Sequence, residues 1–186
     1  VRGIVLPKAE QAQQLASVAA AAPGKALLPL IETAAGFDAV RAIAASPGVQ
    51  RLVFGSIDFQ LDLGIEGDDD ALLFFRSQLV LASRLARLQA PVDGVTTAIG
   101  DEAAVTADAL RARRLGFGAK LCIHPAQVAT VNQAFTPAAA EVDWARRVLA
   151  AAQASGGAAV AVDGKMVDMP VLLRARTLLQ RAGMVA

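Results

Sequence analysis

The sequence of 186 residues has no tyrosine, one tryptophan, one cysteine and one histidine. So few aromatic side chains argue against a protein that stacks on nucleic-acid bases. Eighteen basic residues against seventeen acidic ones also leave no basic excess that would bind a phosphate backbone. A zinc site needs several histidine or cysteine ligands, and one residue of each type is too few. We therefore expect neither a nucleic-acid partner nor zinc.

Long hydrophobic runs are missing as well. None reaches the roughly 18 uninterrupted apolar residues that a membrane-spanning helix needs, so we expect no membrane partner. The single cysteine, Cys122, cannot form a disulfide within the chain, which fits a reducing compartment. The sequence thus favours a cytoplasmic protein whose partners are small molecules and further copies of itself.

What the sequence does contain is an alternation of short β-rich runs with longer helical runs. Strands are expected at residues 3–7, 25–33, 51–58, 92–100 and 119–125. Helices are expected between them, at residues 10–22, 36–46, 69–89 and 101–116. Such alternation is typical of βαβ units and predicts an α/β fold built on a parallel sheet.

The pattern changes after Pro125. Two helices are expected at residues 137–154 and 170–182, with a short β-rich segment between them. In that segment the Asp163-Gly164 pair predicts a two-residue hairpin turn. We therefore divide the chain into a first domain over residues 1–136 and a C-terminal helical segment over residues 137–186.

Polar side chains follow several of the expected strands. In parallel α/β folds the reactive groups lie at the carboxyl ends of the strands. Glu32 and Asp58 end two neighbouring strands, and Mg²⁺ typically takes one or two protein carboxylates together with water and substrate oxygens. The two acids could equally cap helices or pair with Lys8 or Arg51. Spacing alone leaves the metal site and these structural roles open.

Other reactive side chains point less clearly to chemistry. His124 ends the last expected strand and could act as a general base, but a structural hydrogen bond is the commoner role and the one expected here. Lys8 and Lys120 are candidate Schiff-base lysines. Lys120 begins its expected strand, which is the wrong end for catalysis, and Lys8 is at the correct end but follows a proline. Both lysines are therefore expected to be charge partners. Cys122 has apolar neighbours, which favours an inert thiol.

Six motifs, taken in order, resemble one known family. They are "GIVLPKAE", "LLPLIETAAG", "LVFGSIDFQLDLG", "PVDGVTTAIGDE", "GFGAKLCIHPAQV" and "VDGKMVDMPVLLRAR". They are similar to the citrate lyase β-subunit-like proteins and malyl-CoA lyases of the HpcH/HpaI aldolase group, and the resemblance runs through essentially the whole chain.

The resemblance implies a TIM-barrel fold of the (β/α)8 type. Members of the family begin with three βα units that have no counterpart here, so residues 1–136 would supply strands four to eight of the barrel. Residues 137–186 would form a helical cap and oligomerisation segment. The arginine that binds the substrate carboxylate in relatives lies on the third of those strands, and neither Arg2 nor Arg51 stands at a suitable strand end to replace it.

The resemblance also implies an activity and a set of site residues. Mg²⁺, with Mn²⁺ as an alternative, would be held by Glu32 and Asp58. The reaction would cleave a short 2-hydroxyacyl-CoA thioester, such as a malyl, citramalyl or citryl group, to acetyl-CoA and a keto acid. Asp168 resembles a catalytic aspartate that relatives supply from a neighbouring subunit, which implies a homo-oligomer, often a trimer.

Three further functions stay open on the sequence. The same metal pair would serve a class II aldolase that acts on free 2-keto-acids without CoA. A thioesterase would use the Asp168 position. The chain could also be a catalytically incomplete fragment or subunit of such a lyase, an interpretation that the missing arginine favours.

Overall fold

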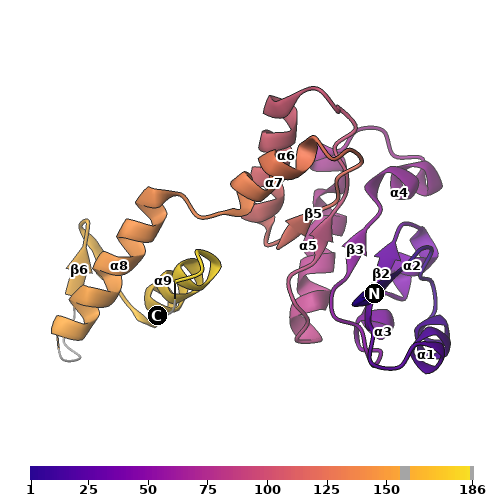
Figure 1. The fold of residues 1–186 in the computed structure, drawn as a ribbon, viewed down its shortest axis with the longest axis horizontal. Helices are drawn as coiled ribbons and strands as arrows, with labels where there is room; N and C mark the ends of the chain where they lie inside the picture. The colour runs from indigo at the N-terminus through magenta and orange to yellow at the C-terminus, as the bar shows by residue number, and fades with distance from the viewer. Residues whose placement is uncertain (156–159, 185–186) are drawn as a thin grey trace. The chain divides into compact units, whose positions relative to one another are not determined.

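The computed structural model describes residues 1–155 and 160–184 of the chain (Figure 1). The chain folds into two compact units, one over residues 1–135 and a second that begins at Thr136. Each unit has its own core and is described separately. No helix in the described part is both long and apolar enough to cross a membrane.

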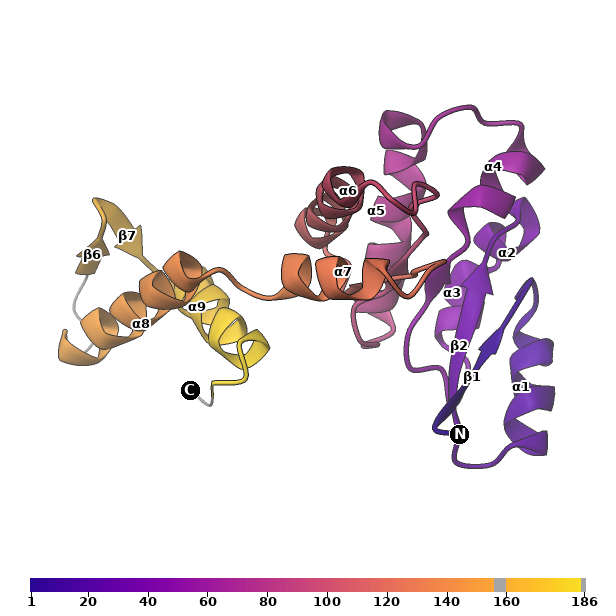
Figure 2. The ribbon, with the colours of Figure 1, turned by 45° about the horizontal axis from the view of Figure 1, so that its top comes forward.

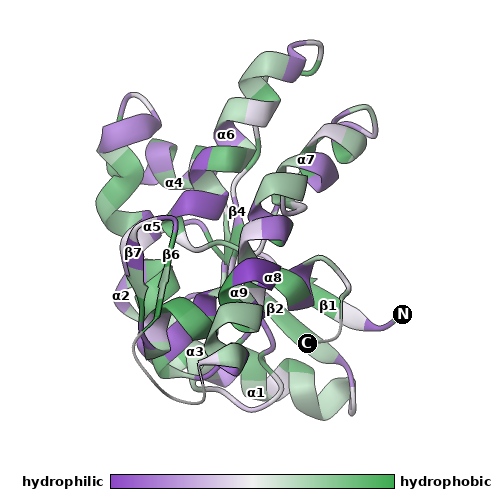
Figure 3. Cartoon of the chain, turned by 90° about the vertical axis from the view of Figure 1, so that its left-hand side faces the viewer, coloured by the Kyte–Doolittle hydropathy of each residue, from purple (hydrophilic) through white to green (hydrophobic). Residues whose placement is uncertain are grey.

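The first unit is built on a five-stranded parallel sheet whose strands follow one another in chain order. The strands are β1 (Gly3–Leu6), β2 (Ala26–Ile31), β3 (Val53–Phe54), β4 (Val92–Asp93) and β5 (Ala119–Lys120). The α/β class and the parallel sheet are therefore confirmed. Figure 2 shows β1 and β2 lying side by side, and both are predominantly hydrophobic (Figure 3).

The sheet of the described residues is open, because β1 and β5 each pair with one strand only. The closed barrel that the family resemblance implies is not formed by this chain alone. Closure of a (β/α)8 barrel takes eight tilted strands with a matching stagger, and five strands cannot meet edge to edge. What the structure contains is a parallel sheet with helices.

Seven helices of the described residues belong to the first unit. They are α1 (Ala12–Ala21), α2 (Ala34–Asp38), α3 (Val40–Ala44), α4 (Ser56–Leu63), α5 (Asp69–Leu85), α6 (Glu102–Leu115) and α7 (Gln127–Phe135). Helix α1 packs against α3, α3 against α5, α5 against α6 and α6 against α7. The helices thus form a continuous layer beside the sheet.

Strand β2 shows which side of the sheet this layer covers. Its side chains alternate, with Leu27, Pro29 and Ile31 buried and Leu28 and Leu30 only half-buried. Because successive side chains of a strand point to opposite faces, one face of β2 packs into the core and the other is less covered. The core includes large, almost fully buried side chains: Leu15, Leu27, Ile31, Ile43, Leu52, Phe54, Phe59, Leu72, Leu79 and Phe117.

Two helices of the first unit lie where the sequence did not predict them. Residues 51–58 were expected to form one strand, but β3 ends at Phe54 and the chain turns into α4 at Ser56. Helix α7 falls in a stretch that had no predicted element. In α4 the buried residues Ser56 and Phe59 are three residues apart, which is helical spacing. So short a stretch of sequence does not distinguish a helix from a strand.

Phenylalanine rings fix α4 against the rest of the unit. Phe59 makes edge-to-face contacts with Phe54 of β3 and Phe75 of α5, at centroid distances of 5.3 Å and 4.8 Å. Phe37 of α2 contacts Phe75 at 5.0 Å. Aromatic pairs in this geometry add to the stabilisation from area burial alone. The start of α4, where Asp58 lies, is therefore held by packing on both sides.

The second unit pairs two helices and carries a hairpin. Its elements are α8 (Ala139–Ala154), β6 (Val160–Val162), β7 (Lys165–Val167) and α9 (Met169–Arg181). Asp163 and Gly164 both have positive φ, 51° and 73°, as a type I′ turn requires, so the hairpin prediction is confirmed. Helices α8 and α9 pack together through Val142, Ala145, Val148, Ala175, Leu178 and Leu179.

Candidate active site

Glu32 lies directly after β2, at the carboxyl end of the sheet, and is 6% exposed. Its Oε1 accepts a hydrogen bond from the backbone N–H of Lys8 at 2.8 Å. The sequence allowed an ion pair between the two residues, but the contact uses the Lys8 main chain. Lys8 has a φ of 46°, which is uncommon for a residue other than glycine. The loop after β1 is thus shaped around the Glu32 carboxylate.

Gly55 makes room for the same carboxylate on its other side. The register pairs Ile31 with Phe54, so Glu32 and Gly55 are the next residues on neighbouring strands. A methyl group at Gly55 would lie 2.5 Å from the Glu32 Cβ and 2.8 Å from its Oε2. Glycine is needed here because of this close approach. Oε2 accepts no hydrogen bond from the described residues.

Asp58 follows Gly55 by three residues and lies in a helix. It is exposed and belongs to the first turn of α4, not to the end of a strand as the sequence suggested. Negative side chains are favourable in the first turn of a helix, where the peptide dipoles leave partial positive charge. Asp62, one turn later, accepts a hydrogen bond at 2.7 Å from the backbone N–H of Ala34, which ties α4 to the start of α2.

The described residues contain no cluster of three or more histidine, cysteine, aspartate or glutamate side chains that could hold a metal ion. This excludes an all-protein cage there. It leaves the two-carboxylate arrangement open, because Mg²⁺ usually keeps several water molecules and binds through one or two carboxylates. Glu32 and Asp58 as metal ligands stay a prediction.

A buried charge network, which sequence reasoning missed, lies beside the sheet. Arg76 of α5 has no exposed surface, and its Nε donates to Asp93 Oδ1 of β4 at 2.9 Å. Its Nη1 forms an ion pair with Asp68 at 2.5 Å, and its guanidinium lies 5.5 Å from the Phe54 ring centroid. The signal was present in the sequence, because Arg76 lies four residues after Leu72 and three before Leu79, on the core face of the helix.

Lys120 joins this network from β5. It ends the strand, not begins it, because β5 stops there, and its Nζ donates to the carbonyl oxygen of Gly94 at 2.7 Å. Burial lowers the pKa of Lys120, and the carboxylates of Asp93 and Asp108 offset only part of that effect. The expected role as a charge partner thus fits its surroundings, although the expected strand end does not.

His124 and Cys122 lie beyond the end of β5, in the loop that leads to α7. His124 is exposed, and its Nδ1 accepts from the backbone N–H of Ala126 at 3.2 Å, so it contributes to the shape of the loop. Burial raises the pKa of the Cys122 thiol, against a smaller opposing effect of Lys120. A raised pKa keeps the thiol protonated, which fits an inert side chain.

Asp168 belongs to the second unit and begins α9. Its Oδ1 accepts from the backbone N–H of Val171 at 3.1 Å, so it is the N-cap of the helix. It is exposed, and its Oδ2 makes no hydrogen bond to the described residues. Helix capping explains the residue structurally, and its catalytic role in a neighbouring subunit stays a prediction.

The charge pairs of Asp68 predict how stability depends on pH. Burial alone would raise the pKa of Asp68, but hydrogen bonds and positive charge from Arg76 and Arg111 outweigh burial and hold it below 3.8. The unfolded chain therefore binds this proton more readily. The stabilisation is complete above pH 3.8 and is lost as the pH falls through the lower pKa of the folded state.

We expect urea unfolding, measured from about pH 6 down to about pH 2, to reveal this dependence. The Asp68→Asn variant should lose less stability across the acid range than the original chain does. Two curves that stay parallel below pH 3.8 would contradict the pairing of Asp68 in the folded state.

The parallel sheet and the carboxylate at its carboxyl edge define an α/β protein of the kind that places its site in the loops after the strands. Comparison with known proteins then gives the family. Residues 1–125 match the model of the HpcH/HpaI aldolase/citrate lyase family. The chain belongs to this family, and the resemblance indicated by its six motifs is confirmed.

Relatives and solved structures agree with this assignment. The chain is 41% identical over 186 residues to a citrate lyase subunit beta-like protein of Deinococcus radiodurans, and 35% identical over 187 residues to a (3S)-malyl-CoA thioesterase of Cereibacter sphaeroides. These alignments cover 95% and 98% of this chain but 65% and 66% of the relatives. The chain thus spans just under two thirds of the length of the curated relatives it matches.

A crystal structure of CitE from Mycobacterium tuberculosis in complex with magnesium, acetoacetate and coenzyme A has a similar fold. Its TM-score to this chain is 0.85 at 34% sequence identity, over 98% of this chain and 68% of that one. The likeness extends through both units of the chain.

Proposed function

We propose that this protein is a Mg²⁺-dependent carbon–carbon lyase that cleaves the CoA thioester of a short 2-hydroxy acid, with the hydroxyl β to the thioester carbonyl as in malyl-CoA, to acetyl-CoA and a keto acid. The observation that carries the proposal is the Glu32 carboxylate at the end of β2. It is buried, Lys8 holds one of its oxygens, and the other oxygen accepts no hydrogen bond from the described residues. A carboxylate oxygen that has no protein partner is a ligand that a hard divalent cation prefers.

The residues present fit a hard divalent cation. Glu32 offers Oε2 beside Gly55, and Asp58 lies in the first turn of the helix that follows. Carboxylate oxygens are the ligands that Mg²⁺ prefers, and Mn²⁺ accepts the same set. When bound, the metal would act as a Lewis acid that orients the substrate oxygens and stabilises developing negative charge.

The chain's own residues would supply the geometry around that metal. The Lys8 main chain fixes the direction of the Glu32 carboxylate, and the phenylalanine contacts of α4 fix the turn that carries Asp58. Asp168, with Oδ2 free of hydrogen bonds to the described residues, would enter the site of a neighbouring subunit and handle a proton there. A homo-oligomer, which the family resemblance leads us to expect as a trimer, and a completed barrel are parts of this proposal.

The name of the Cereibacter relative, a (3S)-malyl-CoA thioesterase, favours thioester hydrolysis as the second candidate function. Both reactions release products that can be measured separately. Lysis yields acetyl-CoA and a keto acid without a free thiol, whereas hydrolysis yields free CoA and the 2-hydroxy acid. An aldolase that acts on free 2-keto-acids would leave every thioester intact.

The test is a panel of malyl-, citramalyl- and citryl-CoA, each incubated with the chain and Mg²⁺ or with a chelator. We expect acetyl-CoA release from at least one thioester, and no release with the chelator. Glu32→Gln should lower the rate by at least about 100-fold. Mutating residues that only hydrogen-bond to a metal ligand already lowers metal affinity or activity by roughly 10–100-fold. Glu66→Gln, at an exposed glutamate, is the control and should leave the rate unchanged.

Three outcomes would contradict the proposal. If the rate of acetyl-CoA release is unchanged by the chelator or by Glu32→Gln, Glu32 does not hold a catalytic metal. Free thiol without acetyl-CoA would favour the thioesterase. If the folded chain releases no product from any thioester of the panel, the interpretation as a catalytically incomplete fragment or subunit is favoured.

A further inference from the structure

Helix α5 of the first unit carries large hydrophobic side chains on the side that faces away from the core. Its core face follows helical spacing and consists of Leu72, Arg76, Leu79, Ala82 and Ser83. Its exposed side includes four large hydrophobic residues, between 42% and 64% exposed: Leu73, Phe74, Leu81 and Leu85. Exposed apolar residues gathered on one face of a folded protein typically mark an interaction site.

The exposed face of α5 has a symmetric sequence. Successive residues of an α-helix are turned by about 100°, so five exposed residues lie within about 40° of one line along the helix: Asp70, Leu73, Ser77, Leu81 and Arg84. Counted from Ser77 in either direction, a leucine follows four residues away and a charged residue seven residues away. The two charges have opposite signs, negative in the first turn of the helix and positive in the last.

The two charged ends of this face have no charged partner within the described part of the chain. Neither Asp70 nor Arg84 forms an ion pair there, whereas the neighbouring acids Asp68 and Asp69 pair with Arg111. The peptide dipoles favour a negative charge at the start of a helix and a positive charge at its end, but they do not require leucines at equal distances from its middle. The apolar and charged side chains of this face thus remain available to a partner.

We propose that a second copy of this chain covers this face, with the two α5 helices antiparallel about a two-fold axis at Ser77. Such an axis brings residues that lie equally far from Ser77, in opposite directions, to the same height along the helix pair. Leu73 of each copy then lies beside Leu81 of the other, and Asp70 lies beside Arg84. The distance between packed helices depends on the side chains at the contact, and the small Ser77 side chain allows a close approach at the centre.

The charge pattern favours a second copy over an unrelated protein. A two-fold contact uses the same surface on both copies, so that surface must be complementary to itself. Opposite charges at equal distances from the centre meet this requirement, whereas charges of one sign would repel an identical face. Helix α5 has 17 residues and is about 25 Å long. A contact of one such helix per copy is small for a protein interface, so we expect a dissociation constant on the order of 10 μM.

Analytical ultracentrifugation from about 1 μM to about 300 μM measures the pairing. We expect the mass to double as the concentration rises. A two-fold contact joins assemblies in pairs, so its loss halves the mass whatever other contacts the copies make, including the one proposed for Asp168. Leu81→Gln should weaken the pairing by at least about 10-fold, because the substitution acts twice in a symmetric contact. Leu61→Gln is the matched control: Leu61 is an exposed leucine of α4, outside this face, and its substitution should leave the pairing unchanged.

Charge reversal tests the antiparallel arrangement directly. Asp70→Arg gives the face two basic ends and Arg84→Asp gives it two acidic ends. Each variant alone should therefore repel its own copy and pair at least about 10-fold more weakly. Mixed in equal amounts, the two variants present opposite charges at both ends and should pair again, as should a chain that carries both changes. Added salt should weaken pairing of the original chain and strengthen pairing of each single variant.

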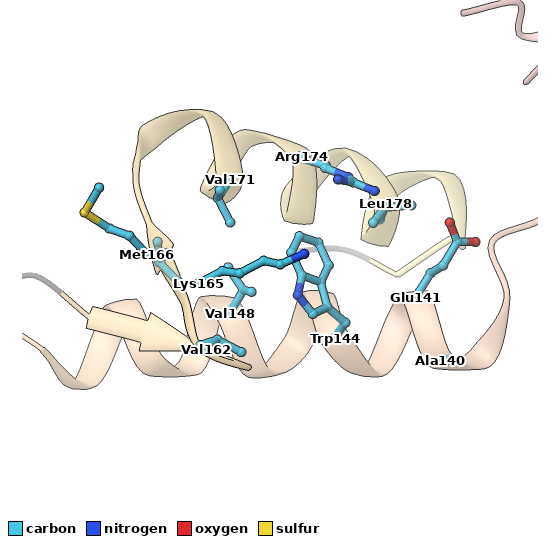
Figure 4. A pocket seen from close by; sticks show the side chains of 11 residues that line it. Ala140, Glu141, Trp144, Val148, Val162, Lys165, Met166, Val171, Arg174 and Leu178 are labelled. Carbon is cyan, nitrogen blue, oxygen red and sulfur yellow. The ribbon is translucent and has the colours of Figure 1, made fainter. Parts of the chain in front are cut away.

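The second unit supplies an independent check on folding. Trp144 is the only tryptophan of the chain, and it lines a pocket of about 400 Å³ that α8, the hairpin and α9 enclose (Figure 4). The Arg174 guanidinium lies over its ring, with Cζ 5.3 Å from the ring centroid, and Lys165 lines the same pocket. Unchanged Trp144 emission would show that the α5 variants keep the fold of this unit, and circular dichroism checks the helices of the whole chain.

The proposal is overturned if Leu81→Gln and both charge variants have the same mass as the original chain at every concentration. The chain would then either not pair at all or pair through another surface. It is also overturned if the two charge variants do not pair when they are mixed, because their charges are complementary at both ends. The measurements need neither Mg²⁺ nor turnover, so failure here and failure of the proposed lyase activity are separate results.

Discussion

Replacing Asp93 with alanine is expected to lower the free energy of unfolding of the chain by about 3–5 kcal/mol. Asp93 has no exposed surface, and its Oδ1 accepts from the Nε of the fully buried Arg76. Removing one partner leaves the other charge buried without compensation, which costs much more than the pair itself contributes. Folded domains are stable by only about 5–15 kcal/mol, so this single change removes a large share.

The arrangement around the pair strengthens the expectation. Two further atoms of the pair, Asp93 Oδ2 and Arg76 Nη2, are buried without a hydrogen-bond partner among the described residues. The negative charge of Asp93 offsets part of the effect of burial on the pKa of Lys120. The substitution would remove this compensation from the buried Lys120 ammonium group. Asp68, which is partly exposed, would be the one carboxylate left to Arg76 among the described residues.

Urea unfolding measures the effect. Asp70→Ala is the matched control, because Asp70 is an exposed carboxylate in the first turn of the same helix as Arg76; its loss should cost less than about 1 kcal/mol. Replacing both buried partners, as Arg76→Met with Asp93→Leu, should recover most of the lost stability, since apolar side chains can fill such a site. An Asp93→Ala variant as stable as the Asp70→Ala control would contradict the buried pair.

Gly55→Ala is expected to disrupt the proposed metal site while changing no ligand. The added methyl group would lie 2.5 Å from the Glu32 Cβ and 2.8 Å from its Oε2. Contacts this short do not occur between real side chains, so Glu32 or strand β3 must move. Overpacking of this kind typically costs about 1–3 kcal/mol of stability, and it displaces the carboxylate from the position that the Lys8 N–H fixes.

We expect the Mg²⁺ affinity of the chain, measured by calorimetry, to fall by at least about 10-fold in Gly55→Ala. Substitutions that displace a metal ligand without replacing it have effects of this size. Gly100→Ala is the control: its added methyl group would meet nothing within 4 Å, and its φ is not in the left-handed region. Unchanged Mg²⁺ affinity in a destabilised Gly55→Ala variant would show that Glu32 is not a metal ligand.

The order of strands and helices could be predicted from the sequence, and the reason is local. β1 and β2 are continuous apolar runs bounded by proline or polar residues, and α5 and α6 carry apolar side chains at helical spacing with Gly116 as the left-handed cap of α6, at a φ of 101°. The Asp163-Gly164 turn likewise depends on two adjacent residues. Patterns of this kind depend on residues that are close in the sequence, so they can be recognised without knowledge of the fold.

The lengths of the later strands could not be predicted in this way. β3, β4 and β5 each have only two paired residues, although the apolar runs around them are longer. Pairing depends on the register with a strand far along the chain, and the turn into α4 depends on Phe59 meeting Phe54 and Phe75. Asp58 was therefore placed on a strand although it belongs to a helix.

The sequence by itself determined the family, the parallel α/β class and the candidacy of Glu32, Asp58 and Asp168, because motifs and periodicity are local and directly visible. Only the tertiary structure decided which carboxylate is buried with a free oxygen, that Arg76 and Asp93 share one buried pair, and that Trp144, Lys165 and Arg174 line one pocket. These facts join residues from separate elements. Their energies come from the removal of charge and aromatic surface from water, which only the folded chain brings about.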